Sequence, residues 1–197
     1  MSKLKIVSLD GTWHLKNQEH GIKIPAEVPG SVFGALLKEG QIKDPFYGLR
    51  EKEMNWVHES TWTYHQEFKA DEEILCRANI LLSFQGIDCI SEVFLNDQPL
   101  GSTEDMFLEY RFDVKSKLKK GQNELKVVIS SPTKEASERI KEHGTKLRTY
   151  KAIPGVPYLR KAQYSFGWDW GPWLPDMGMW KPVRLIAWDD LKIDSVH

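Results

Sequence analysis

Short segments with the residue pattern of β-strands recur along this chain, and turn residues separate them. In residues 61–68, Trp62, Tyr64 and Phe68 fall on one face, which is the two-residue period of a half-buried strand. Asn96-Asp97-Gln98-Pro99 supplies the turn of a hairpin. The same reasoning predicts strands at residues 61–68, 79–84, 90–95, 109–114, 124–129 and 183–188. This density of strands indicates an all-β fold, a β-sandwich or jelly roll.

Two short helical insertions are expected to interrupt the strands. Ser31 can cap a helix over residues 31–40, because its hydroxyl can accept a free amide of the first turn and Gly40 can end the helix. A second, more polar helix is predicted over residues 132–147, with Gly144 near its end.

Composition restricts the class of protein. The chain has 197 residues and a mass of 22.8 kDa, enough for one large domain or two small ones. Its 27 Lys and Arg residues nearly cancel its 28 Asp and Glu residues, which predicts no binding to nucleic acid or to an anionic membrane. The sequence shows no apolar run of transmembrane length and no signal peptide, so a cytoplasmic protein is expected.

The reactive side chains give no indication of a metal or cofactor site. The six histidines lack metal-ligand spacing, and none pairs with a serine or cysteine in an obvious nucleophile arrangement. Cys76 and Cys89 lie in neighbouring strand-like segments and could touch, but two cysteines without a secretion signal favour free core thiols. The sequence therefore predicts no metal, no cofactor and no catalytic histidine.

One stretch rich in tryptophan points to a class of ligand. Residues 164–173 read Tyr-Ser-Phe-Gly-Trp-Asp-Trp-Gly-Pro-Trp, and five of the eight tryptophans fall between Trp168 and Trp188. Indole faces pack against the apolar C–H face of a pyranose, and a carboxylate accepts hydrogen bonds from its hydroxyls. The pattern therefore predicts carbohydrate binding by Trp168, Asp169 and Trp170.

Each of these residues also has a purely structural explanation. Asp169 could accept backbone amides within a tight turn, and Trp170 could pack under its loop. Trp56 follows a loop and could belong either to the core or to a binding pocket. Arg160 and Lys161 are expected to form a solvated pair or to donate a salt bridge to another domain. Four further indoles are expected in the core: Trp13, Trp62, Trp180 and Trp188.

Several motifs together resemble a known family. In chain order they are Leu9-Asp10-Gly11-Thr12-Trp13, Val28-Pro29-Gly30-Ser31-Val32, Asp44-Pro45-Phe46-Tyr47-Gly48, Trp56-Val57, Phe84-Gln85-Gly86-Ile87-Asp88, Val93-Phe94-Leu95-Asn96-Asp97 and the run at residues 160–172. The last motif is the longest and the richest in rare residues. With them the chain resembles, over essentially its whole length, the N-terminal domain of glycoside hydrolase family two, and within that family the β-mannosidase branch.

The resemblance implies a galactose-binding-domain-like jelly roll over residues 1–190, with residues 191–197 opening an immunoglobulin-like domain. It implies a retaining exo-β-mannosidase, which hydrolyses terminal non-reducing β-D-mannose and holds its two catalytic glutamates in a (β/α)₈ barrel outside this chain. This chain alone is therefore expected to be inactive. Its implied partners are a β-mannoside oligosaccharide and the barrel and immunoglobulin-like domains of the full-length protein.

The resemblance also implies a role for the tryptophan motif. Asp169 would bond hydroxyls on the non-reducing side of the terminal mannose, and Trp168 and Trp170 would form walls of the pocket or support the loop. Trp56 is a weaker candidate for the same pocket. The family commonly has histidine where Phe33 stands and asparagine near Arg50, so the outer pocket is expected to differ there.

Other functions also fit the sequence. A free-standing carbohydrate-binding module would bind sugar without a partner domain. An interaction domain would use its tryptophans as a protein interface and would self-associate or await a foreign partner. Within the hydrolase interpretation, a related exo-β-glucosaminidase or β-galactosidase is the alternative to a β-mannosidase.

Overall fold

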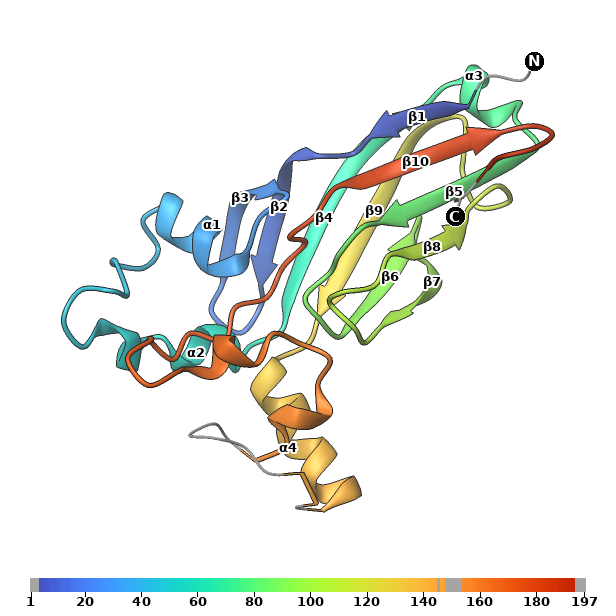
Figure 1. Ribbon diagram of the computed structural model, residues 1–197. Helices are drawn as coiled ribbons and strands as arrows, with labels where there is room; N and C mark the ends of the chain where they lie inside the picture. The colour runs from blue at the N-terminus through green and yellow to red at the C-terminus, as the bar shows by residue number, and fades with distance from the viewer. Residues whose placement is uncertain (1–3, 145, 148–153, 194–197) are drawn as a thin grey trace.

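The protein, seen in a computed structural model, is a sandwich of two antiparallel sheets (Figure 1). The structure describes residues 4–144, 146–147 and 154–193. The described strands are β1 (Lys5–Ser8), β2 (Gly11–Asn17), β3 (Ile22–Val28), β4 (Trp62–Ala70), β5 (Asn79–Phe84), β6 (Ser91–Leu95), β7 (Gln98–Thr103), β8 (Tyr110–Asp113), β9 (Gly121–Ile129) and β10 (Val183–Trp188). The described α-helices are α1 (Val32–Lys38), α2 (Asn55–His58), α3 (Glu72–Leu75) and α4 (Pro132–His143), with 3₁₀-helices η1 (Arg50–Glu53), η2 (Val156–Tyr158) and η3 (Gln163–Phe166).

The strand order is β1-β10-β5-β8 in the smaller sheet and β3-β2-β4-β9-β6-β7 in the larger one. The longest ladder joins β4 to β9, from Trp62 opposite Ile129 to Ala70 opposite Gly121. The first described strand pairs with the last, because β1 runs antiparallel to β10. This arrangement confirms the predicted all-β jelly-roll sandwich with short helical insertions.

Alternating side chains from both sheets fill the space between them. Trp13 and Trp62 project from the larger sheet, Leu82 and Leu185 project from the smaller one, and all four are buried. The indole of Trp62 also satisfies its polar atom, since Nε1 donates to the main-chain oxygen of Val57 at 2.8 Å. The two-residue period of the strands therefore places the apolar residues inside, as it should in a sandwich.

The six predicted strands are confirmed, and β5 and β10 have the predicted ends. The hairpin between β6 and β7 turns at Asn96 and Asp97, whose φ angles of 52° and 63° suit these short polar side chains. The sequence did not predict β1, β2, β3 and β7. Of these, β3 and β7 are edge strands that contain Pro25 and Pro99, and proline weakens the strand pattern.

Both predicted helices are present, and one is shorter than expected. Ser31 caps α1, with its Oγ accepting from the amide of Gly34 at 3.2 Å, and Gly40 follows the helix with a φ of 66°. The second helix, α4, ends at His143, because Gly144 leaves the helical conformation with a φ of 72°. Helices α2 and α3 were not predicted, since four residues are too few to show a helical period.

Two of the four tryptophans expected in the core lie elsewhere. Trp180 lies in the loop before β10, is partly exposed, and donates its Nε1–H to the main-chain oxygen of Met106 at 3.1 Å. Trp188 is only half-buried, because the alternation of β10 turns Ala187 inward and Trp188 outward. The pattern located both residues on or near a strand but did not give the side of the sheet.

The cysteines and the end of the chain also bear on the predictions. Both cysteines are free, as predicted, but only Cys89 is buried, and Cys76 lies at the surface after α3. Leu191 and Ile193 are exposed and lie outside any strand, and residues 194–197 lie outside the described residues. The second domain predicted from residue 191 and the cytoplasmic localisation therefore stay predictions.

Candidate functional site

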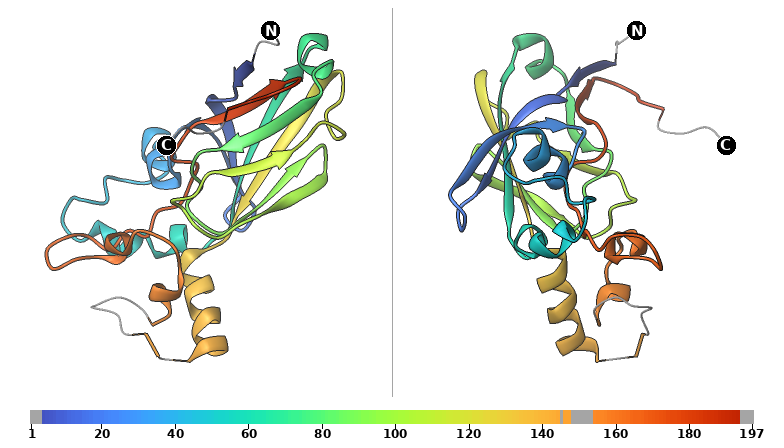
Figure 2. Two further views of the ribbon diagram at one scale, coloured as in Figure 1. Left: turned by 45° about the vertical axis from the view of Figure 1, so that its right-hand side comes forward. Right: turned by 90° about the vertical axis from the view of Figure 1, so that its left-hand side faces the viewer.

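A long excursion between β9 and β10 builds one end of the molecule. After β9 the chain forms α4, which projects from the sandwich, and returns through η2 and η3 before it enters β10 (Figure 2). In Figure 1 this returning segment lies near α2, at the end of the sandwich away from α3. The excursion thus brings residues 154–182 beside the loops that join the strands at this end.

A small apolar cluster anchors the returning chain on α4. Ala136 of α4 packs with Val156, Leu159 and Phe166, and all four are buried. Gly155 makes the close approach possible: its φ is 93°, and a Cβ added there would lie 1.9 Å from the main-chain oxygen of Ala136. The returning chain is therefore held against α4 at Gly155, where it begins.

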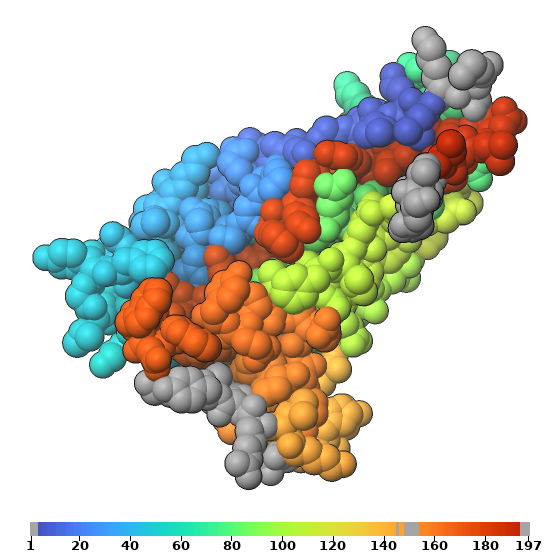
Figure 3. All heavy atoms as spheres, in the orientation of Figure 1, coloured from blue at the N-terminus to red at the C-terminus, as the bar shows by residue number. Residues whose placement is uncertain are grey.

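The returning segment forms a wall of a cavity of about 770 Å³. The lining is mainly apolar and aromatic, with Phe46 from the loop after α1 and Tyr164, Trp168 and Trp170 from the excursion. Trp168 is 56% exposed and Trp170 is 89% exposed, so neither indole packs under its loop. Figure 3 shows the orange atoms of this segment beside the cyan atoms of the loop after α1.

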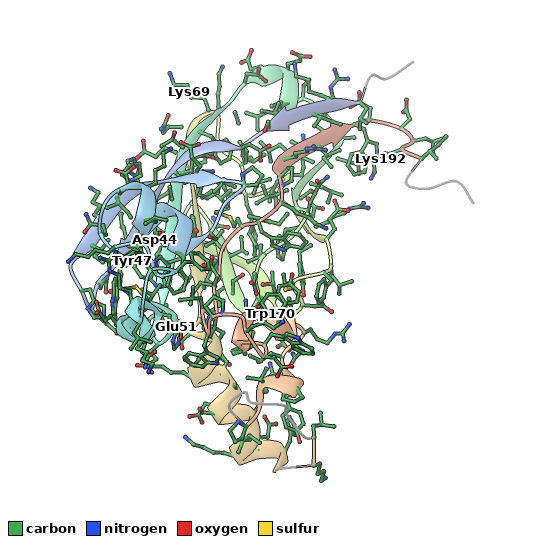
Figure 4. The ribbon with its side chains drawn as sticks, turned by 60° about the vertical axis from the view of Figure 1, so that its left-hand side comes forward. Asp44, Tyr47, Glu51, Lys69, Trp170 and Lys192 are labelled. Atoms are coloured by element: carbon green, nitrogen blue, oxygen red, sulfur yellow. The ribbon has the colours of Figure 1, made fainter. Side chains whose placement is uncertain are left out.

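The structure brings together part of the predicted site. Trp168 and Trp170 line the same cavity, whereas Asp169 is exposed between them and is not among the lining residues. Trp170 lies in the returning segment, at the end of the sandwich away from Lys69 (Figure 4). Trp56 is half-buried on the core side, with its ring 4.7 Å from that of His20, and it does not line the cavity.

A second hollow of about 280 Å³ adjoins the cavity and shares Phe46, Leu174 and Asp176 with it. Phe33 of α1 lines this second hollow. The family resemblance had indicated a difference in the outer pocket at this residue. Arg50 begins η1, after the loop that follows α1, and its guanidinium carbon lies 4.8 Å from the centre of the Tyr47 ring. The side chain of Phe33 is thus near the candidate site, while Arg50 is occupied with Tyr47.

A buried ion pair lies beneath the cavity. The side chain of Lys161 is inaccessible to solvent, and its Nζ donates to Asp88 Oδ2 and, at 2.5 Å, to the main-chain oxygen of Asp176. Both aspartates line the cavity. The prediction of a solvated Arg160–Lys161 pair is therefore wrong for Lys161, and only Arg160 stays at the surface, where it pairs with Asp105 at 3.2 Å.

Burial shifts the pKa of two carboxyl groups on the cavity floor. It raises the pKa of the Asp88 carboxyl, while the Lys161 ammonium opposes this change. It also raises the pKa of the Asp176 carboxyl, against hydrogen bonds from the hydroxyl of Ser31 and the amide of Phe33. Aromatic walls above a floor of polar acceptors suit a ring that has one apolar face and several hydroxyls.

Sequence reasoning did not identify this floor. Asp88 and Lys161 are 73 residues apart, so no local pattern connects them. The available indication was that each belongs to a motif of the family resemblance, Asp88 at the end of Phe84-Gln85-Gly86-Ile87-Asp88 and Lys161 in residues 160–172.

Tyr64 provides a first test of this polar region. Its buried hydroxyl has no hydrogen-bond partner within residues 4–144, 146–147 and 154–193, and burial raises its pKa, with the nearby Asp176 adding to the shift. Tyr64→Phe is expected to leave the free energy of unfolding unchanged or to raise it by up to about 1 kcal/mol, because it removes an unpaired buried group. Urea unfolding measures the change. A loss of more than about 1 kcal/mol would show that the hydroxyl has a partner, such as a buried water.

His58 connects the sandwich to the excursion. It is buried in α2, with Nδ1 3.4 Å from the hydroxyl oxygen of Thr133. Its ring meets that of Trp173 edge-on, with 4.5 Å between the centroids. Burial lowers the pKa of the His58 imidazole to about 4, so the folded protein holds this ring neutral at pH 7.

His58 is expected to make folding stability depend on pH. The unfolded chain binds a proton at this ring near pH 6.5 and the folded chain near pH 4, so the contribution is complete above 6.5 and is lost as pH falls from 6.5 towards 4. The loss is at most about 3 kcal/mol. Urea unfolding at several pH values between about 7.5 and 4.5 measures it. The variant His58→Gln should show a smaller pH dependence, and equal dependence in both proteins would contradict this prediction.

Two further kinds of site are absent from the described part of the chain. There, no three His, Cys, Asp or Glu side chains gather closely enough to hold a metal ion. Likewise, none of the described helices has the length and apolar composition needed to cross a bilayer.

The fold and the cavity place the chain among the galactose-binding-like jelly rolls. It belongs to the family of glycosyl hydrolase 2 galactose-binding domain-like proteins, whose family model matches residues 13–181. It is 35% identical to a β-mannosidase of Bos taurus over 199 residues, which cover 95% of this chain and 22% of the bovine protein. A β-mannosidase B of Aspergillus niger is 30% identical, with 96% of this chain and 24% of the fungal protein covered.

Solved structures agree with this assignment. A β-D-mannosidase from Dictyoglomus thermophilum superposes with a TM-score of 0.90 and 42% identity, over 94% of this chain and 23% of that one. A β-glucuronidase from Bifidobacterium dentium superposes with a TM-score of 0.60 at 18% identity, over 94% and 30% of the two chains, which shows the fold alone. The chain is thus homologous to one domain of β-mannosidases and spans about a fifth of their length.

Proposed function

We propose that this chain is the sugar-recognition domain of a retaining exo-β-mannosidase whose catalytic barrel lies outside these 197 residues. The observation that carries the proposal is the sequence match to β-mannosidases. The match covers 94–95% of this chain but only 22–23% of the β-mannosidases themselves. The closely related relatives act, by name, on β-mannosides, whereas the glucuronidase likeness is below 20% identity. The ligand of the proposed site is the terminal mannose of a β-mannoside oligosaccharide.

The geometry of the site supports sugar recognition by this chain and catalysis by the barrel in such an enzyme. Trp168 and Trp170 are both exposed beside the cavity, and indole rings can stack on the apolar face of a pyranose. Asp169, exposed between them, can accept hydrogen bonds from hydroxyls at the non-reducing end of the sugar. Retaining hydrolysis needs two carboxyl groups on either side of the glycosidic bond, and these belong to the barrel. The chain by itself is therefore inactive and supplies only the far wall of the glycone pocket.

Activity assays on aryl glycosides test the proposal. The complete protein that contains this chain is expected to release the aryl group from an aryl β-mannoside, and the 197-residue chain is expected to release none. Matched β-galactoside, β-glucuronide and β-glucosaminide substrates distinguish the related branches. Preference of the complete protein for one of these would replace mannose as the proposed substrate.

A free-standing carbohydrate-binding module is the second candidate, and the size of the cavity within this chain alone favours it. Titration of the isolated chain with mannobiose, followed by tryptophan fluorescence, separates the two candidates. Saturable binding that is lost in Asp169→Ala would support the binding module. A flat titration from a folded chain would support the hydrolase domain, because half of its pocket then lies elsewhere.

A further inference from the structure

Lys161 lies beneath the cavity and connects three separate parts of the chain. Its ammonium donates to the carboxylate of Asp88 and to the main-chain oxygen of Asp176, and its whole side chain is buried. A lysine is almost never fully buried unless such partners compensate the loss of water. The side chain of Lys161 therefore holds Asp88 and Asp176 together.

The two contacts lie at the base of the segment that carries the cavity tryptophans. Lys161 directly precedes residues 162–176, and Asp176 is the last residue of that segment. The bond of 2.5 Å from Nζ to the Asp176 oxygen thus joins the beginning of the segment to its end. Between them, Trp168 and Trp170 reach the cavity wall.

Asp88 connects this base to the sandwich. It follows β5, and its amide donates to the main-chain oxygen of Gly178 at 2.8 Å, while the amide of Gly178 donates back to Asp88 at 3.0 Å. Gly178 in turn lies on the chain that enters β10. The ion pair therefore fixes the base of residues 162–176 relative to two strands of the smaller sheet.

We propose that Lys161 is a positioning residue, which closes the base of residues 162–176 on Asp88 and thereby sets where Trp168 and Trp170 stand in the cavity wall. The sandwich core does not depend on this contact, because its apolar residues lie between the two sheets. The inference deepens the proposed function and rests on it only where sugar recognition is concerned.

Three variants separate positioning from simple stabilisation. Lys161→Met keeps the length of the side chain but leaves the charge of Asp88 buried and unpaired, so it is expected to destabilise the fold. Combining it with Asp88→Asn removes both charges, which restores stability while the bond to Asp176 is still missing. Arg160→Met is the matched control, since this neighbouring cation is exposed and pairs with Asp105 at the surface.

Hydrogen exchange followed by mass spectrometry on the 197-residue chain is the first measurement. In the double variant, residues 162–176 are expected to exchange roughly tenfold faster or more, with β4 and β9 unchanged and the urea midpoint close to that of the wild type. Arg160→Met should exchange like the wild type. Wild-type protection of residues 162–176 in the double variant would overturn the proposal, because the pair would then serve folding stability alone.

A second measurement follows KM and kcat for an aryl β-mannoside in the complete protein. The double variant is expected to raise KM several-fold, because displaced walls weaken sugar binding. An unchanged KM beside faster exchange would overturn the claim that Lys161 sets the cavity walls. If the wild type does not hydrolyse mannosides, the proposed function fails, while the exchange experiment still decides the positioning role.

Discussion

Replacing Asp169 with alanine is expected to lower kcat/KM for an aryl β-mannoside by roughly 10- to 150-fold in the complete protein. A charged acceptor that bonds ligand hydroxyls contributes about 1.5–3 kcal/mol, and each 1.4 kcal/mol is a factor of ten. Folding should change little, because Asp169 is exposed. The experiment therefore separates a role in recognition from a role in the turn.

The controls for this variant follow from the same geometry. Asp169→Asn keeps one carbonyl acceptor and is expected to lose less activity than alanine. Asp190→Ala removes another exposed carboxylate, just after β10, and should leave kcat/KM unchanged. Wild-type turnover of Asp169→Ala would refute the assigned role, and an equal loss of thermal stability would assign Asp169 to the turn.

Replacing Gly155 with alanine is expected to lower the free energy of unfolding by at least about 3 kcal/mol. Its φ of 93° is strained for any side chain, which alone costs about 1–3 kcal/mol. The new Cβ would also lie 1.9 Å from the main-chain oxygen of Ala136 and 2.9 Å from Cγ1 of Ile140. Since a main-chain atom of α4 cannot move aside easily, the returning chain must lift from the helix.

Gly144 offers a matched control at the end of the same helix. Its φ is 72°, yet a Cβ added there would meet no atom within 4 Å. Gly144→Ala therefore carries backbone strain without the collision and is expected to cost about 1–3 kcal/mol. Urea unfolding of both variants isolates the collision as the difference. Equal losses would show that α4 and the returning chain are not held in contact at Gly155.

The interior of the sandwich could be predicted from the sequence because its determinants are local. Alternation around Trp62 or Leu185 follows directly from the two-residue period of a strand, and burial confirms it. Counted from Leu185, the same period turns Trp188 outward, so the expectation that Trp188 lies in the core did not follow the alternation of its own strand. The edge strand β3 escaped prediction, because Pro25 weakens its strand pattern.

The candidate site could be predicted only where one segment supplies it. Trp168 and Trp170 are close in sequence and line the same cavity, so the motif alone placed them together, while their contact with sugar stays a prediction. The burial of Lys161 depends on Asp88, which a different loop brings into contact, and no local pattern contains that information. Trp56 was left open between core and pocket for the same reason, because its contact with His20 is set by the fold.

The strands on either side of the excursion belong to different sheets, with β9 in the larger and β10 in the smaller. Their registers are fixed by β4, β6, β1 and β5, none of which lies between them in the chain. No strand of either sheet lies in the described part of residues 130–182, so the loop that carries Trp168 and Trp170 can change without breaking these ladders, whereas Met177 and Met179 belong to the sandwich core. Most of the cavity wall thus lies in the segment between β9 and β10. An insertion in that loop would change the ligand preference of the cavity and leave the pairing of the strands as it is.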